Sequence, residues 1–289
     1  MPLELVANVT IAGLLTGLVY GLMALGLSVI FGVVRVVNFA HGEMMTIAMY
    51  AAVVLFAAFG MDPFIALFPV AAVFFLFGYA LQAGLINPFI TRPEHTQFML
   101  VLAVAIIMVN GLLMAFGPDA RNVPVDYALD SFGIGPLLLD KVRVYAAVAA
   151  VAAAGGLFLF FKFTPTGSAI RACADNNLGA KVVGLNVKKY YALTFGLGSA
   201  CVGAAGCLMV LLVDVTPVLG PGYTLLAFII VIVGGLGSMA GALLGGVLIG
   251  VSEALAGLYF TPSAKSMFSF ALLILVLLLR PQGLLGKRS

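Results

Sequence analysis

Two acidic side chains lie inside or beside long apolar runs, and they are the first candidates for chemistry. Glu43 ends a polar segment, Asn38–Glu43 (NFAHGE), and Glu253 interrupts the apolar run around Val251–Ala254. Ionisable groups in such runs often relay protons or bind coupling ions. His41 and Glu43 do not predict a metal site, because no further ligand cluster accompanies them. The segment is either a plain cytoplasmic turn, since Arg35 lies just upstream, or, as we expect, a structured connection that caps the next helix, with Glu43 near its positive end.

Glycine forms a second pattern with a physical meaning. It recurs every four residues at two places, Gly13-Gly17-Gly21 and Gly237-Gly241-Gly245. Small residues at this spacing let another helix backbone approach closely, so we interpret both strips mainly as packing surfaces. The run Gly234-Gly235-Leu236-Gly237-Ser238 differs, because its glycines give the backbone freedom to leave the helix. Irregular backbone at membrane depth is tolerated only where it is buried in protein or lines a watery cavity.

A basic loop lies between residues 162 and 190. It contains one acid, Asp175, against five bases: Lys162, Arg171, Lys181, Lys188 and Lys189. Its central part, Thr166–Gly184, is polar, compatible with helix and too long for a tight turn. It could be an anchor attracted to anionic lipids or a docking helix for a cytoplasmic partner. The chain contains no GxxxxGK[ST], no HExxH and no Ser/His/Asp constellation, so the sequence predicts neither a nucleotide site nor an enzyme.

The elements that position these residues must be membrane helices. Of the 289 residues, 63% are apolar and 9% are charged, whereas soluble domains carry about 25% charged residues. The apolar stretches are too long and too continuous for a β-barrel. We therefore predict an all-α fold, a polytopic transmembrane helical bundle in a single domain over residues 1–289. We expect the three cysteines to act as small packing residues and not to form a disulfide or a metal site.

Eight apolar stretches are long enough to cross a bilayer or nearly so. The last but one has about 35 residues and is too long for one straight span, so we expect it to break at the glycine-rich run. The count then becomes nine segments, with a range of eight to ten. The stretches are Leu5–Val34, Asn38–Phe59, Phe64–Ile86, Phe98–Phe116, Val144–Phe161, Tyr191–Val213, Thr224–Leu258 and Ser266–Leu279.

The loop charges predict an orientation, since basic residues favour the cytoplasmic side. The loop 162–190 and the C-terminal tail, with Arg280, Lys287 and Arg288, then face the cytoplasm. The acidic loop Gly117–Arg143 faces outward, and the N-terminus lies outside. This layout places ten of the fourteen basic residues inside and seven of the eleven acids outside. It also requires the glycine-rich break, because a single crossing at 224–258 would leave the tail outside.

Several ordered motifs make the chain resemble a known family over nearly its whole length. They are GLMALGL from Gly21, NFAHGE from Asn38, TGSAIRACA from Thr166 with GLN from Gly184, VGGLGSMAGALLGG from Val233, and RPQGLLG from Arg280. In this order and spacing they resemble the permeases of branched-chain amino acid ABC importers, in particular the shorter, LivH-type subunit. The motifs are mostly structural and do not report the solute.

The resemblance implies a fold of the kind shared with ribose and vitamin B12 importers, with broken or re-entrant helices. It implies partners: a second, LivM-type permease, two cytoplasmic ATPase subunits of the LivG and LivF type, and a periplasmic binding protein. Those ATPases would hold ATP and Mg²⁺, so we expect no cofactor in this chain. We expect membrane lipid around it, no nucleic acid, and a multi-pass position in the bacterial inner membrane.

The resemblance also assigns site residues. The coupling helix would be Arg171–Gly184, with contacts to an ATPase through Arg171, Ala172, Asn176, Gly179, Ala180 and Gly184. Helix breaks beside the translocation path would involve Asn38, His41, Gly42, Glu43, Gly234, Gly235, Gly237 and Ser238. No catalytic residue and no metal ligand is expected.

The function expected from the sequence is therefore ATP-driven import of branched-chain or related hydrophobic amino acids. An importer of the same type for an amide, urea or an aromatic acid is the first alternative. An ion-coupled secondary transporter is the second, because such proteins also use broken helices and intramembrane charges. The scarcity of paired carboxylates favours an apolar path, on which Glu253→Gln would lower uptake only modestly.

Overall fold

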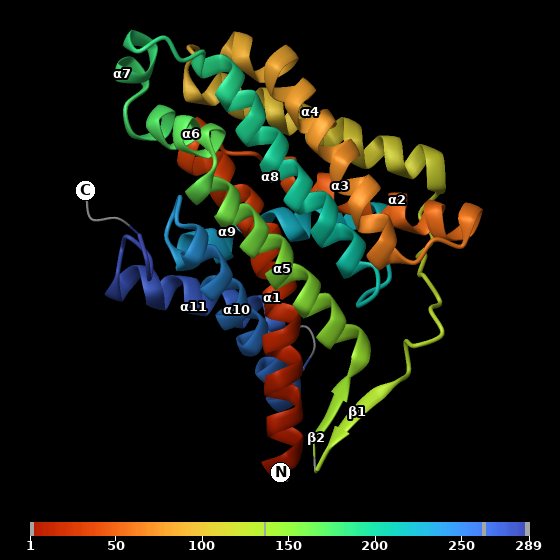
Figure 1. Cartoon of the computed structure of the whole chain (residues 1–289). Helices are drawn as coiled ribbons and strands as arrows, with labels where there is room; N and C mark the ends of the chain where they lie inside the picture. Colours follow the sequence, from red (N-terminus) through yellow and green to blue (C-terminus); the bar gives the residue numbers. More distant parts are fainter. Residues whose placement is uncertain (1–2, 136, 262–263, 287–289) are drawn as a thin grey trace.

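The computed structural model describes residues 3–135, 137–261 and 264–286, and helices make up most of this part of the chain (Figure 1). The helices are α1 Leu3–Val34, α2 His41–Phe59, α3 Pro63–Ala80, α4 Glu94–Phe116, α5 Lys141–Phe163, α6 Pro165–Asp175, α7 Asn177–Val182, α8 Val187–Met209, α9 Gly220–Gly234, α10 Met239–Tyr259 and α11 Lys265–Leu279. The shorter elements are the π-helix η1 Leu81–Ile86, the 3-10 helices η2 Asn87–Phe89 and η3 Pro217–Leu219, and the strands β1 Ser131–Ile134 and β2 Leu137–Asp140.

Nine apolar helices correspond to the nine segments predicted from the sequence. Eight helices of the described chain are long and apolar enough to cross a membrane, counting the short helices that extend α3 and α9, and α11 is a shorter apolar helix. The all-α class of a multi-pass membrane protein is thereby confirmed. The antiparallel β1–β2 hairpin, which pairs Ser131 with Asp140, was not predicted, because its strands are only four residues long.

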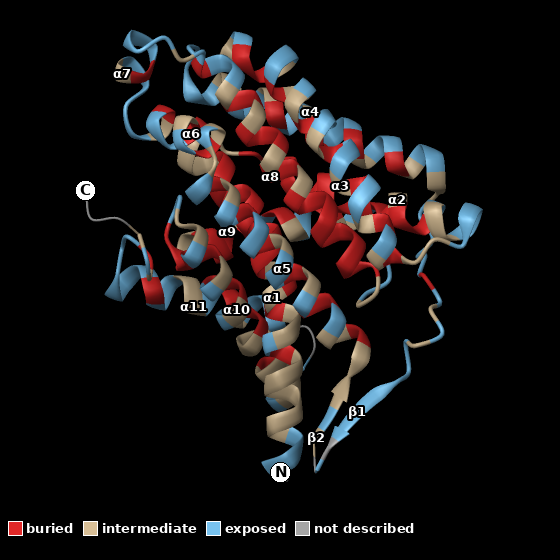
Figure 2. Cartoon of the chain, in the orientation of Figure 1, coloured by how far each residue is buried: buried red, intermediate tan, exposed pale blue. Residues whose placement is uncertain are grey.

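Two helices form the centre of the bundle. Within the most apolar 18-residue stretch of each helix, 78% of the residues are buried in α1 and 83% in α8. The buried share is only 22% in α3 with its extension and in α4. Figure 2 shows buried residues concentrated on the central helices. The outer helices expose large apolar side chains such as Phe68, Leu76 and Ile107. This pattern is typical of helices whose outer faces contact lipid.

α1 contacts its neighbours backbone to backbone through glycine. A Cβ atom on Gly17 would lie 2.7 Å from the carbonyl oxygen of Gly246 in α10. A Cβ atom on Gly26 would lie 2.5 Å from the carbonyl oxygen of Gly198 in α8. Carbon and oxygen atoms do not approach this closely without a bond between them, so only glycine fits at these crossings. The glycine strip on α1 is a packing surface, as predicted.

The second predicted strip packs against a different helix. Gly241 lies against Gly234 of α9, where neither residue has space for a side chain. A Cβ atom on Gly245 would lie 2.5 Å from the carbonyl oxygen of Ile230, also in α9. The next residue, Gly246, faces α1 instead. α10 therefore presents glycine to two helices on adjacent faces.

The connecting segments gather at two ends of the bundle. In Figure 1, α6 and α7 lie at the upper left, and the β1–β2 hairpin lies beside the N-terminal end of α1 at the bottom. The Leu138 N–H donates to Asn8 Oδ1 at 3.1 Å and so joins the hairpin to α1. We call the α6–α7 end the basic end and the hairpin end the acidic end, after the charges of their loops. Lys287 and Arg288, which we predicted to add to the basic end, lie outside the described residues.

The α1–α10 contact leads to a first prediction. Gly17→Ala adds a methyl group that must push α10 away, which costs about 1–3 kcal/mol of stability. We expect the melting temperature of the detergent-solubilised protein to fall. The matched control is Gly156→Ala on the outer face of α5, where nothing lies within 4 Å of the added Cβ atom. There, alanine should be neutral or slightly stabilising because it favours helix. Equal melting temperatures for both variants would contradict a glycine-dependent contact.

Candidate functional site

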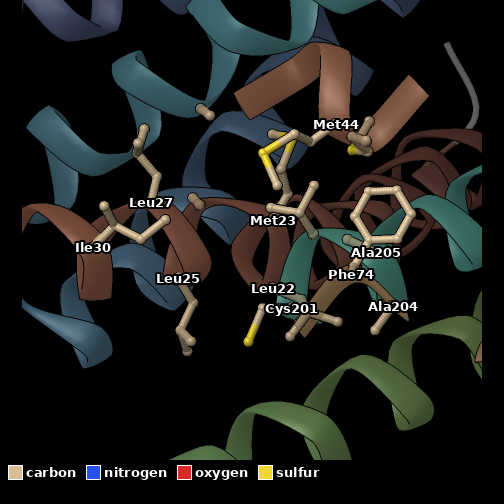
Figure 3. Packing of buried hydrophobic residues seen from close by; sticks show 14 of the residues in the cluster. Leu22, Met23, Leu25, Leu27, Ile30, Met44, Phe74, Cys201, Ala204 and Ala205 are labelled. Atoms are coloured by element: carbon tan, nitrogen blue, oxygen red, sulfur yellow. The ribbon is translucent and has the colours of Figure 1, made fainter. Parts of the chain in front are cut away.

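The connection between α1 and α2 turns back into the bundle. α1 ends at Val34, and Arg35 takes a left-handed conformation with φ 59°. The imidazole Nε2 of His41, at the start of α2, lies 2.9 Å from the carbonyl oxygen of Met23. Met23 precedes Val34 by about 16 Å along the helix. α2 therefore begins deep inside the bundle, within the apolar cluster that includes Met23 and Met44 (Figure 3).

The first turns of α2 and α9 meet at this depth. A Cβ atom on Gly42 would collide with the carbonyl oxygen of Gly220 and the nitrogen of Thr224. The Gly42 N–H donates to Thr224 Oγ1 at 2.8 Å, and the Thr224 hydroxyl donates to Glu43 Oε2 at 2.8 Å. The residue before α2, Ala40, has no side-chain oxygen, so a threonine from α9 supplies the cap. We call this contact the α2–α9 junction.

All four residues predicted in this segment are buried: Asn38, His41, Gly42 and Glu43. Asn38 Oδ1 accepts a hydrogen bond from the Ala40 N–H at 3.1 Å and shapes the turn before α2. His41 Nδ1 has no hydrogen-bond partner among the described residues. A plain cytoplasmic turn would expose these side chains to water, so that alternative is wrong. The expected structured connection, with Glu43 in the first turn of the next helix, is present.

The α2–α9 junction concentrates positive partial charge. Each helix N-terminus is equivalent to about half a positive charge, and two of them lie together here. A Cβ atom on Gly220 would lie 2.9 Å from Cα of Glu43, so the α9 terminus directly contacts the residue that bears the carboxylate. Glu43 is 4% exposed. Its carboxylate therefore offsets the partial charges of both termini at a place that bulk water does not reach.

The predicted break between α9 and α10 is present. α9 ends at Gly234, and α10 begins at Met239. Gly235 and Gly237 have φ values of 107° and 78°, which L-residues rarely adopt. Ser238 Oγ accepts a hydrogen bond from the Gly241 N–H at 3.1 Å and caps α10. The run of glycines thus separates two helices rather than bending one.

Residues of the RPQGLLG segment complete the end of α9. The Leu284 N–H donates to the Val233 carbonyl at 2.9 Å, and the Leu285 N–H donates to the Gly234 carbonyl at 2.9 Å. The last carbonyls of a helix lack partners within the helix, so this segment supplies them. Sequence reasoning missed the contact. Both segments are rich in glycine, but nothing in their spacing indicates that one pairs with the other.

The predicted coupling loop consists of two helices rather than one. α6 ends at Asp175, and α7 begins at Asn177 after a break at Asn176. The Asn176 side chain accepts a hydrogen bond from the Gly179 N–H at 2.8 Å and caps α7. Gly184 has a φ of 86° and ends the loop before α8. A continuous helix over Arg171–Gly184 was therefore wrong, because the asparagine side chain favours a new N-terminus over a further helical turn.

The residues assigned to ATPase contact differ in exposure. Arg171, Ala172, Asn176 and Gly184 are exposed, Gly179 is half-buried and Ala180 is buried. α7 and the residue that follows it also expose three apolar side chains that the prediction omitted: Leu178, Val182 and Val183, each 74–80% exposed. The presence of three apolar residues in a basic loop was the sequence signal that could have identified them. Exposed apolar groups outside the long apolar helices often mark a protein interface.

A cavity of about 670 Å³ connects the α9–α10 break with α6. Gly237 and Ser238 line it from the break, and Arg171 lines it from α6. Arg35 lies at the same cavity, and Asp175 contributes an acid. The structure thus brings together two groups of predicted residues that are more than fifty positions apart in the sequence. The α2–α9 junction lies deeper, since α9 is about 22 Å long and joins the two places.

The three cysteines are free and buried, as expected for packing residues. Cys173 lies on the inner face of α6, and burial raises the pKa of its thiol above the usual value. It therefore stays protonated and unreactive near neutral pH. At the acidic end, burial and the neighbouring Asp62 raise the pKa of Tyr127, which donates a 2.6 Å hydrogen bond to Asp62 Oδ2.

Comparison with solved structures gives alignments that include most of the chain. PsaBC from Streptococcus pneumoniae in complex with Fab gives a TM-score of 0.47 and 15% sequence identity, covering 93% of this chain and 91% of that one.

Sequence comparison gives a family match over almost the whole length. The profile described as branched-chain amino acid transport system / permease component matches residues 9–277. The permease protein BraD of a high-affinity branched-chain amino acid transport system in Pseudomonas aeruginosa is 30% identical, over 95% of this chain and 94% of its own. LivH of Escherichia coli is 29% identical over the same shares. A probable LivH of Methanocaldococcus jannaschii is 28% identical over 92% and 88%. The chain belongs to the family of branched-chain amino acid transport permeases.

Proposed function

We propose that this chain is the permease subunit of an ATP-driven importer that moves branched-chain or related hydrophobic amino acids across the bacterial inner membrane. The observation that carries the proposal is the family match over residues 9–277, with relatives named for this transport. The chain contains no nucleotide-binding motif. The ATPase activity, with its ATP and Mg²⁺, therefore belongs to partner subunits of the LivG and LivF type.

Two further partners complete the proposed importer. A LivM-type permease pairs with this chain, and the translocation path lies between the two. A periplasmic binding protein delivers the solute to the acidic end. The basic end, with its Lys- and Arg-rich loops, faces the cytoplasm, in agreement with the usual bias of membrane proteins. Residues 284 and 285 contact the end of α9 at the basic end, so the proposal has the C-terminal segment in the cytoplasm as well.

The α6–α7 loop transmits the motion of an ATPase to the membrane helices. Its exposed apolar residues, Leu178, Val182 and Val183, enter a groove of the ATPase, with Arg171 and Asn176 at the rim. α6 is held tightly to α5, since a Cβ atom on Gly167 would lie 2.5 Å from the Phe160 carbonyl oxygen. A push on α6 therefore moves α5 and alters the cavity it shares with Gly237 and Ser238.

The broken helices change shape during transport. α9 is held at one end by the α2–α9 junction and at the other by the glycine break. Both ends have close backbone contacts through glycine, and the Thr224 hydroxyl adds hydrogen bonds at the deep end. Glycine contacts can slide without repacking a core. Asn38, His41, Gly42 and Glu43 anchor the deep end, and Gly234, Gly235, Gly237 and Ser238 provide the hinge.

The test of the proposed function is uptake of radiolabelled leucine by cells or proteoliposomes. We expect uptake only when the chain is combined with its partner permease, both ATPases and the binding protein. Removing the ATPases, or replacing ATP with a non-hydrolysable analogue, should abolish it. Uptake by this chain without an ATPase, driven by a proton or sodium gradient, would establish secondary transport instead.

A second prediction concerns docking. Val182→Asp places a charge where an apolar contact forms, and an unpaired charge at an interface costs several kcal/mol. We expect the ATPase subunits to lose at least about tenfold in affinity for the permease, measured by co-purification and by ATP-dependent uptake. The matched control is Leu129→Asp at the acidic end, where the leucine is 98% exposed. Equal affinity for the ATPase subunits and equal uptake in the two variants would exclude α7 as the docking element.

Two other variants test the coupling itself. Arg171→Glu reverses a charge at the rim, and Gly184→Val imposes about 1–2 kcal/mol of backbone strain at a positive φ. Nothing lies within 4 Å of a Cβ atom at residue 184, so this variant meets no steric clash in the bundle. We expect both variants to assemble but to hydrolyse ATP with reduced uptake. Normal uptake in both would contradict a coupling role.

A third prediction fixes the orientation. Ser238 lines the cavity at the basic end, so Ser238→Cys should react with a membrane-impermeant thiol reagent only from the cytoplasmic side. Leu129→Cys, at the opposite end, should react only from the periplasmic side. Labelling of inside-out and of right-side-out vesicles distinguishes reaction from the cytoplasmic side from reaction from the periplasmic side. The reverse labelling pattern would invert the topology of the whole chain.

A fourth prediction concerns the α2–α9 junction. Thr224→Val preserves shape but leaves the Gly42 N–H and the Glu43 carboxylate without the hydroxyl. Each unsatisfied buried polar group costs about 1–3 kcal/mol, so we expect a lower melting temperature and reduced uptake. Thr224→Ser keeps the hydroxyl and should retain most of both. If valine were tolerated as well as serine, the hydrogen bonds at the junction would have no part in its stability.

A further inference from the structure

Glu253 has polar neighbours that its sequence context did not reveal. It lies in α10, and Ser269 of α11 donates to Glu253 Oε1 at 2.8 Å. Tyr20 of α1 and Lys265 at the start of α11 also interact with this carboxylate. Three helices thus contribute to the surroundings of one acid. Such a site is costly to build within a membrane, and acids kept there usually have a function.

Glu253 opens onto a cavity of about 250 Å³ between α9, α10 and α11. This is the volume of about eight water molecules, so the cavity suits a small solute. Its wall combines one carboxylate and two hydroxyl-bearing serines with apolar groups. The lining residues include Glu253, Ser266, Ser269, Tyr223, Leu226 and Phe270.

The cavity lies at the depth of the α2–α9 junction. Glu253 follows the start of α10 by 14 residues, or about 21 Å, and Gly220 precedes the end of α9 by 14 residues. With the α9–α10 break at the surface of a hydrocarbon layer of about 30 Å, both would lie inside that layer, in its acidic half. A carboxylate that faced lipid there would be strongly unfavourable, so the mouth of the cavity must face water or protein. The path between the two permeases is the watery space that the proposed function requires.

The N-terminal part of α9, Gly220–Thr224, has two faces with different neighbours. Thr224 faces Glu43 across the α2–α9 junction, whereas Gly222 and Tyr223 line the Glu253 cavity. Nothing lies within 4 Å of a Cβ atom built on Gly222. The glycine therefore leaves open space beside the N-terminal part of the helix formed by η3 and α9, which carries positive partial charge. The cavity thus combines a carboxylate, a helix N-terminus and an apolar wall.

We propose that this cavity is the point on the translocation path that receives the solute and recognises a zwitterionic amino acid. The α-ammonium group binds the Glu253 carboxylate, the α-carboxylate lies at the first turn of α9 beside Gly222, and the apolar side chain packs on Leu226 and Phe270. The inference rests on the proposed function and names the recognition element within it. It replaces the expectation that Glu253→Gln has only a modest effect.

The first test uses the assembled importer in proteoliposomes, with leucine as the solute. Glu253→Gln preserves size and can still accept a hydrogen bond from Ser269, but it cannot pair with an ammonium group. We expect leucine uptake to fall at least tenfold while loaded binding protein still stimulates ATP hydrolysis. Glu253→Asp keeps the charge at a shorter reach and should show an intermediate rate. The control Glu4→Gln, an exposed acid at the acidic end, should transport as the unsubstituted chain does.

The second test does not depend on transport. Gly222→Cys, in a chain whose three native cysteines are replaced, should react with a charged methanethiosulfonate, because that reagent needs a water-exposed thiol. Millimolar leucine should slow the reaction severalfold. Gly156→Cys on the outer face of α5 should remain unreactive.

These outcomes separate the inference from the proposed function. If the unsubstituted importer takes up leucine but Glu253→Gln is equally active, the cavity does not recognise the ammonium group. An unreactive Gly222→Cys would show that the cavity is not on a watery path, and a reactive one without protection by leucine would show that it does not bind this solute. No ATP-dependent leucine uptake by the unsubstituted importer would instead refute the proposed function.

Discussion

The structure depends on contacts in which two helix backbones touch with no side chain between them. Gly17 against Gly246, Gly26 against Gly198 and Gly42 against Gly220 hold α1, α2, α8, α9 and α10 at distances that a single methyl group would disrupt. In lipid there is little hydrophobic gain from bringing apolar helices together, so close van der Waals packing must supply the cohesion. The same contacts leave the helices free of interlocking side chains. A membrane protein that must both cohere and move is well served by such surfaces.

The α2–α9 junction extends this principle to electrostatics. Helix N-termini inside a membrane carry partial charges and unsatisfied N–H groups, both of which are costly away from water. Here the Thr224 hydroxyl of α9 accepts a hydrogen bond from the Gly42 N–H of α2 and donates one to the Glu43 carboxylate, so one side chain of α9 caps α2. Because α9 also borders the Glu253 cavity, its first turn lies between two acids. A small rotation of α9 would change its position relative to both.

Much of the architecture could be predicted from the sequence, because apolar length and loop charge are strong signals in membrane proteins. The break at Gly234–Ser238 followed from segment length and parity. The depth of the α2–α9 junction could not be predicted, since the left-handed Arg35 that turns the chain inward is a conformation with no sequence signature. The division of α6 from α7 depended on one side chain, Asn176, which favours a cap over a further turn. The surroundings of Glu253 escaped prediction because Tyr20, Lys265 and Ser269 approach it from other helices.

The hydrogen bonds between Leu284 or Leu285 and the end of α9 have a consequence for biogenesis. The accepting carbonyls, at residues 233 and 234, are synthesised about fifty residues before their donors. At typical translation rates of about 5–20 residues per second, α9 therefore waits several seconds with its end open. During that time water, lipid headgroups or an insertion factor must occupy the place of the missing donors. The end of α9 becomes complete only after the segment that follows α11 has folded back, so a nascent chain at this stage still lacks the native contact between residues 284–285 and α9.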